Sequence, residues 1–323
     1  MANLQGDYYE FGEAEKCYKE ALGIRRKLAE VNPRTHLPDV GMTLNNLAVL
    51  QSDANEPGEA EKSYKEALEI YRKLAEVNPQ TYLPSVGMTL NNLAVLQSDE
   101  NEPREAEKSY KEALEIYRKL AEVNPQTYLP FIAGILNNLA VLQSDENEPG
   151  KAEKSYKEAL EIYRKLAEVN PQTYLPFIAG ILNNLAVLQS DENEPGKAEK
   201  SYKEALEIYR KLAEVNPQTY LPFIAGILNN LAVLQSDENE PGEAEKSYKE
   251  ALEIYRKLAE VNPEVYSLDY AFTADNLALL YRYNLINRQK SIHYANEAVR
   301  GFAPFIDTVP FAAKWHKVAQ AIM

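Results

Sequence analysis

The sequence predicts an all-α solenoid, in which antiparallel helix pairs stack and share one continuous core. Two segments, Ala-Glu-Lys-Ser-Tyr-Lys-Glu-Ala-Leu and Leu-Asn-Asn-Leu-Ala, each recur every 46 residues with apolar residues at helical spacing. Neither segment can bury its apolar face alone, so neighbouring repeats must stack. The first segment begins at Ala60, Ala106, Ala152, Ala198 and Ala244, and the second at Leu44, Leu90, Leu136, Leu182 and Leu228.

The first helix of a repeat is expected at about residues 130–145 of the reference unit. Its apolar residues, such as Ile132 and Leu136, fall on one face. Pro130 suits a first helical turn, where its missing N–H is not needed. The following Glu-Asn-Glu-Pro-Gly breaks the helix, and Asn147 is expected to cap the next one.

The second helix is expected at about residues 149–169, where the pair Asn170 and Pro171 stops it. Its buried stripe is predicted to consist of Ala152, Tyr156, Ala159, Leu160, Tyr163 and Leu166.

The whole chain, 1–323, is expected to form a single array of about six 46-residue units. Residues 3–13 align with the end of a first helix and the turn after it, so the array is expected to start inside a unit. The last unit, 244–302, is degenerate, and a capping helix is expected at about 307–323, including Trp315 and Val318.

Composition narrows the function classes. The chain is 45% hydrophobic and 26% charged, which is normal for a folded protein. The net charge of −14 disfavours nucleic acid as a partner. No apolar run approaches the roughly 20 residues that cross a bilayer, so no membrane partner is expected. The N-terminus lacks the regions of a signal peptide, and cytoplasm is the default location.

No catalytic chemistry is expected from the sequence. The single cysteine, Cys17, replaces a repeated serine, and the three histidines lie outside metal-ligand spacing. No phosphate-binding glycine loop or nucleophile motif occurs. We therefore expect no enzyme, no cofactor and no metal.

The repeat resembles the tetratricopeptide repeat (TPR) on the residues Leu136, Leu139-Ala140, Ala152, Tyr156 and Ala159. The 46-residue unit is longer than the usual unit of about 34 residues. Lengthened units with Leu-Asn-Asn-Leu-Ala look most like those of kinesin light chains and of many bacterial proteins. The resemblance implies a right-handed superhelix with a concave groove and a protein or extended peptide as ligand.

The resemblance implies a column of ligand contacts on the groove side of the first helices. A carboxamide offers both a donor and an acceptor, so such a column can grip a peptide backbone. The alternative is a hydrated surface tied to its own backbone. The second asparagine, Asn138, is expected to fasten adjacent units. The expected contacts are Asn45, Asn91, Asn137, Asn183, Asn229, Asp275, Val95, Val141 and Val187.

Three units differ from the earlier ones by Phe131-Ile132-Ala133-Gly134-Ile135 and its copies at Phe177 and Phe223. Phe131 and Ile135 are four residues apart and therefore share a helical face. They form either extra packing between units or an exposed apolar strip for a partner or for self-association.

Residues 106–151 and 152–197 are identical, and 198–243 differs only at Glu243. Packing restrains only the residues of the buried stripe, so identity of the exposed residues as well indicates recent gene duplication or deliberate construction. Whether the origin is natural or engineered stays open. Identical units suit a periodic or extended ligand. The alternative function is a structural element, a homo-oligomer or filament built by end-to-end stacking.

Overall fold

A computed structural model describes the backbone of residues 2–322 and their side chains except those of residues 2–10 and 310. These residues form fourteen α-helices and one short 3₁₀ helix, without strands, so the predicted all-α class is confirmed. The helices are α1 Ala2–Val31, α2 Pro33–Asp53, α3 Pro57–Val77, α4 Pro79–Asp99, α5 Pro103–Val123, α6 Pro125–Asp145, α7 Pro149–Ala167, α8 Pro171–Asp191, α9 Pro195–Ala213, α10 Pro217–Asp237, α11 Pro241–Val261, α12 Pro263–Tyr283, α13 Arg288–Phe302 and α14 Pro310–Ile322, with the 3₁₀ helix at Ala303–Phe305.

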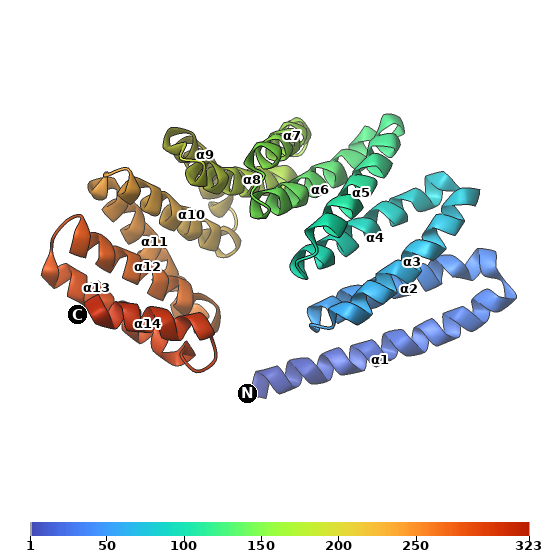
Figure 1. The fold of residues 1–323 in the computed structure, drawn as a ribbon, viewed down its shortest axis with the longest axis horizontal. Coiled ribbons are helices and arrows are strands. Elements are labelled where there is room, and N and C mark those ends of the chain that lie inside the picture. The colour runs from blue at the N-terminus through green and yellow to red at the C-terminus, as the bar shows by residue number, and fades with distance from the viewer. Residues whose placement is uncertain (1, 323) are drawn as a thin grey trace. The chain divides into compact units, whose positions relative to one another are not determined.

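The chain divides into two compact parts, which meet in sequence between Ile162 and Tyr163. Within each part, consecutive helices fold back on one another as antiparallel pairs (Figure 1). A single array over residues 1–323 and its right-handed superhelix stay predictions.

Each part has an inner and an outer layer of helices. In the first part, α4 contacts both α2 and α6, whereas the described residues of α1, α3 and α5 make no close backbone contact between these helices. In the second part, α10 contacts both α8 and α12, and α9 and α11 stay apart in the same way. In a curved stack the layer whose helices meet lies on the concave side. The even-numbered first helices therefore form the inner layer of each part.

The first helix of a repeat begins five residues earlier than the sequence indicated. Helix α6 starts at Pro125, and Pro130 lies inside it. The side chain of Asn124 caps the helix by accepting a 3.3 Å hydrogen bond from the Thr127 backbone N–H. Pro125 takes the first-turn position, where no N–H is needed. The prediction for Pro130 was wrong because Asn124-Pro125 ends one helix and immediately begins the next.

Asn147 ends a helix and does not cap the following one. Its φ of 58° is left-handed. Its N–H bonds the carbonyl of Ser144 at 3.0 Å, and the N–H of Glu148 bonds the carbonyl of Gln143 at 2.8 Å. These two bonds are the Schellman arrangement of a helix C-terminus, and asparagine adopts the left-handed conformation more readily than most residues. The capping prediction was therefore wrong.

Helix α1 runs unbroken from Ala2 to Val31, so the turn predicted within residues 3–13 is wrong. The aligned turns combine a left-handed asparagine with proline, such as Asn55 and Pro57. Tyr9 and Phe11 stand at those two positions of α1. Without the asparagine and the proline, nothing interrupts the helix.

Small residues allow the helices of a repeat to approach closely. Ala106 and Ala113 are 0% exposed in α5, and Tyr110 between them is 2% exposed. The aromatic ring fills the space that the two alanines leave against neighbouring helices.

The last helix, α14, packs on α12, as the predicted capping helix requires. Trp315 meets the ring of Phe272 edge-on, with 5.6 Å between ring centroids, and Ala312 and Ala319 are fully buried. The helix begins at Pro310, three residues later than expected.

Candidate functional site

The inner layer presents one exposed strip on each first helix, which we call the first-helix face. On α6 it consists of Phe131, Gly134, Asn137, Asn138 and Val141, whose spacing places them on one side of the helix. Val141 is 38% exposed, although it lies between buried neighbours in the sequence. The other valines of the face, Val49, Val95, Val187 and Val233, are 37–40% exposed.

The predicted asparagine column is exposed only in its middle. Asn91, Asn137, Asn183 and Asn229 are partly exposed on the first-helix face. At the two ends, Asn45 is 4% exposed and Asp275 is 1% exposed. The expected ligand contacts of Asn45 and Asp275 are therefore corrected, because neither side chain reaches the surface.

Amide hydrogen bonds join the asparagines of neighbouring repeats at two places, whereas Oδ1 of Asn137 and Oδ1 of Asn183 are buried without a partner. Nδ2 of Asn138 donates to Oδ1 of Asn91, one repeat earlier, at 3.5 Å, and Nδ2 of Asn91 donates to Asn92 at 3.4 Å. In the second part, Asn276 donates to Asn229 at 3.3 Å. The fastening role predicted for the second asparagine is confirmed in these pairs. Asn91 keeps one N–H and one lone pair for another partner.

Phe131 and Ile135 do not form the apolar strip that was one of the two alternatives. Ile135 is 3% exposed and belongs to the core. The Phe131 ring stacks on Tyr117 of α5 with 5.0 Å between centroids, yet it is 47% exposed. Packing between helices accounts for Ile135, whereas Phe131 both packs and contributes to the first-helix face.

Met42 and Met88 also lie on this face, 45% and 40% exposed, and are not among the ligand contacts expected from the sequence. Each stands three residues before the first asparagine, Asn45 or Asn91. That spacing is the signal by which they could have been found.

Burial changes the chemistry of Asp275. Desolvation raises the pKa of its carboxyl to about 6, and neither carboxyl oxygen has a hydrogen-bond partner. Every first helix before α12 has asparagine at this position, which would stay neutral there.

A second ionic site joins α11 to α12 and α13. The hydrogen bond from Lys249 and, to a smaller extent, the one from the Tyr281 hydroxyl lower the pKa of Glu245 to about 2. Lys290 lies 3.5 Å from the same carboxylate. These side chains connect the three helices, and their charges are paired with one another.

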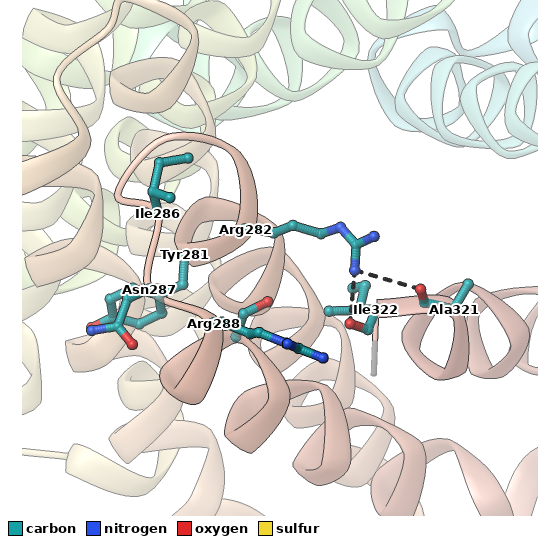
Figure 2. A pocket seen from close by; sticks show the side chains of 8 residues that line it. Tyr281, Arg282, Ile286, Asn287, Arg288, Ala321 and Ile322 are labelled. Carbon is teal, nitrogen blue, oxygen red and sulfur yellow. Dashed lines mark hydrogen bonds between the residues drawn. The ribbon is translucent and has the colours of Figure 1, made fainter.

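A cavity of about 410 Å³ is lined by residues of α12, α13, α14 and the turn between α12 and α13. Figure 2 shows the side chains that line it. The Arg282 side chain extends toward α14, where its Nη1 donates to the backbone carbonyl of Ile322 at 2.7 Å. Arg288 and Asn287 also line the cavity. The cavity contains none of the first-helix face residues, and its main polar contact holds α14 in place.

The part of the chain that the structure describes contains no group of three or more histidine, cysteine, aspartate or glutamate side chains that could hold a metal ion. Within the same residues, no helix is long and apolar enough to cross a membrane. Cys17 is exposed and has no disulfide partner there.

Known proteins support the repeat assignment. The family model described as "Tetratricopeptide repeat" matches five consecutive segments, 40–79, 86–125, 132–171, 178–217 and 224–263. No curated protein matches the chain.

Solved structures resemble this chain over most of its length. BtubC (BKLC) from P. vanneervenii is 26% identical with a TM-score of 0.62, over 76% of this chain and 90% of that one. Apo RapI is 14% identical with a TM-score of 0.60, over 87% and 97%. Nearly identical TPR-like repeats from a provisional kinesin light chain of Podosopora anserina are 15% identical with a TM-score of 0.56, over 69% and 98%. The five matched segments cover more than half of the chain, which therefore belongs to the tetratricopeptide repeat family.

Proposed function

We propose that the chain is a polypeptide-binding scaffold whose ligand lies on the first-helix face. The family is built of scaffolds that typically mediate protein interactions. The observation that carries the proposal is the recurring exposure of an apolar side chain beside a partly exposed amide. Val187 and Asn183 of α8 are one such pair, and Val233 and Asn229 of α10 repeat it 46 residues later.

This combination suits an extended polypeptide. The valines offer apolar area to alternate side chains, and each buried CH₂ contributes about 0.8 kcal/mol. The amide oxygen of Asn183 is buried, so the amide N–H that Asn184 leaves free is the group that it offers to a peptide carbonyl. Asn183 already bonds Asn184, and Asn229 already accepts from Asn276, so ordering these two amides for binding costs little rotamer freedom.

The test is a selection of 12-residue peptides from a random library against the intact chain, followed by affinity measurements with two charge variants. The double variant Val187→Glu/Val233→Glu puts carboxylates on the first-helix face. The control, Val169→Glu/Val215→Glu, makes the same change at valines 75% and 78% exposed near the ends of second helices.

We expect the first variant to weaken binding of the selected peptides about tenfold or more, and the control to leave it unchanged. Circular dichroism should show that both variants stay helical. Equal affinity for the two variants would remove the first-helix face as the binding surface.

A further inference from the structure

The first helices come in two kinds that differ in where glycine stands. Helix α4 contains Gly87 followed by Met88, whereas α8 has Ala179 followed by Gly180. The glycine has thus moved by one residue, from a buried position to the first-helix face. Helix α10 repeats the second kind with Gly226.

Packing explains Gly87 and does not explain Gly180. A Cβ on Gly87 would lie 2.7 Å from the ring of Tyr117, so no larger residue fits without movement. A Cβ on Gly180 would meet only the Tyr209 hydroxyl at 3.6 Å, an ordinary contact. Glycine inside a helix costs stability relative to alanine. What Gly180 adds is bare helix backbone, which lets another chain approach closely.

Apolar side chains border this bare stretch of helix. Phe177, three residues before Gly180, is 51% exposed and stacks on Tyr163. Val187 lies seven residues after Gly180 on the same side and is 38% exposed. Phe223 and Val233 stand in the same relation to Gly226. Each of these glycines therefore has an exposed phenylalanine beside it on the first-helix face.

The charge on these helices has one sign. Helices α8 and α10 contain no lysine or arginine, and each ends in an exposed aspartate, Asp191 or Asp237. Neither aspartate forms an ion pair within 4.0 Å among the described residues, and the C-terminal end of a helix is itself partly negative. Most basic residues of the neighbouring second helices already pair with carboxylates, as Arg210 does with Glu250 at 2.7 Å.

We propose that the first-helix face of α8 and α10 takes an extended segment that is apolar at one end and basic at the other. This rests on the proposed function and names its ligand class. The segment's backbone passes over Gly180 or Gly226, and an apolar side chain packs against Phe177 or Phe223. A lysine or arginine then pairs with Asp191 or Asp237.

The spacing within the segment follows from the helix. Gly180 and Asp191 are eleven residues apart, which is about 16 Å along an α-helix. An extended chain covers this length with about five residues. The apolar and basic residues of the ligand are thus about five positions apart.

The experiment uses the intact chain and three synthetic decapeptides, each with Leu-Phe-Leu near its start. The three peptides place lysine, serine or glutamate pairs about five residues further on. We expect the lysine peptide to bind at least about tenfold more tightly than the glutamate peptide, with affinity falling as salt rises.

Two pairs of variants locate the site. Gly180→Met/Gly226→Met inserts the residue that α4 carries at this position, and Gly196→Met/Gly242→Met makes the same change at second-helix glycines with nothing within 4 Å. We expect Gly180→Met/Gly226→Met to weaken binding of the lysine peptide about tenfold, and Gly196→Met/Gly242→Met to leave it unchanged.

Asp191→Asn/Asp237→Asn is compared with Glu168→Gln/Glu214→Gln, which removes equal charge from exposed ends of second helices. Only the aspartate variant should lose the preference for lysine over glutamate. The ligand class would be wrong if the three peptides bound equally, if the glutamate peptide bound more tightly, or if both charge variants lost the same affinity. The proposed function would still stand in that case, provided that peptides from the library bind. If the library selection also yielded no binding peptide, both the ligand class and the proposed function would be wrong.

Discussion

The hydroxyl of Ser109 donates a 2.9 Å hydrogen bond to Oε1 of Gln97, joining the two helices of one repeat inside the core. Gln97 is 6% exposed and Ser109 is 8% exposed. The same pair recurs in the other repeats as Ser63–Gln51, Ser155–Gln143, Ser201–Gln189 and Ser247–Gln235. A buried polar bond at a fixed place favours one register between the two helices, because sliding one helix along the other would separate the serine from the glutamine.

Ser109→Ala should destabilise the protein by about 1–3 kcal/mol, because Oε1 of Gln97 stays buried without its donor. Gln97→Leu/Ser109→Ala removes both partners and should recover much of the loss. Urea denaturation followed by circular dichroism measures both. If the double variant lost as much free energy of unfolding as the two single variants together, the loss in Ser109→Ala would not come from breaking this hydrogen bond.

Asn101→Ala should cost about 1–2 kcal/mol, because Asn101 has a φ of 60° that alanine adopts unfavourably. Asn101→Gly should lie within about 0.5 kcal/mol of the parent, since glycine accepts this conformation. Thermal unfolding of the two variants side by side separates the backbone effect from loss of the side chain. Equal destabilisation by alanine and glycine would contradict it.

Ile286→Asn should stabilise the protein by about 1 kcal/mol. Ile286 has a φ of 48°, which is costly for a β-branched residue, and its side chain is 74% exposed. Asparagine relieves the backbone strain, and little apolar burial is lost. The free energy of unfolding in guanidinium chloride gives the answer, and a less stable variant would show that the isoleucine side chain matters more than its backbone.

Asp275→Asn should stabilise the protein at neutral pH and remove part of its pH dependence. The pKa of Asp275, about 6, lies above the value of about 4 for an unfolded aspartate. Its contribution to stability is therefore fully present below about pH 4 and is lost as the pH rises through about 6. The difference amounts to about 3 kcal/mol.

The measurement is the free energy of unfolding of parent and variant between pH 4 and pH 8. The two curves should converge near pH 4, separate as the pH rises from about 4 to about 6, and keep a constant separation above that. Asp237→Asn, at an exposed aspartate, is the control and should show no such separation. Parallel curves for Asp275→Asn would mean that the carboxyl is not desolvated in solution.

Arg118→Ala should change stability by no more than about 1 kcal/mol, although Arg118 and Glu158 lie 2.7 Å apart. Both side chains are substantially exposed, so water screens the pair. The repeated Arg–Glu pairs of the outer layer are thus predicted to set helix spacing more than stability. A melting temperature that fell as far as for Ser109→Ala would contradict this.

The helical class and the repeat boundaries could be predicted because local signals carry them. The spacing of Ala106, Tyr110 and Ala113 marks a buried helix face whatever lies opposite. Errors arose where one residue type serves two purposes. Pro130 fits a first turn and also tolerates a place inside a helix, and Asn147 suits either end of a helix.

The amino-acid sequence by itself determined the period, the helix pairing and the residues that face the core, since periodicity and helix stops act within a few residues. Only the tertiary structure decided which residues of the asparagine column reach the surface. Asn45 and Asn91 stand in the same local sequence, yet one is buried and the other partly exposed. Exposure depends on what packs against a helix from outside its own repeat, and no pattern within the repeat records that.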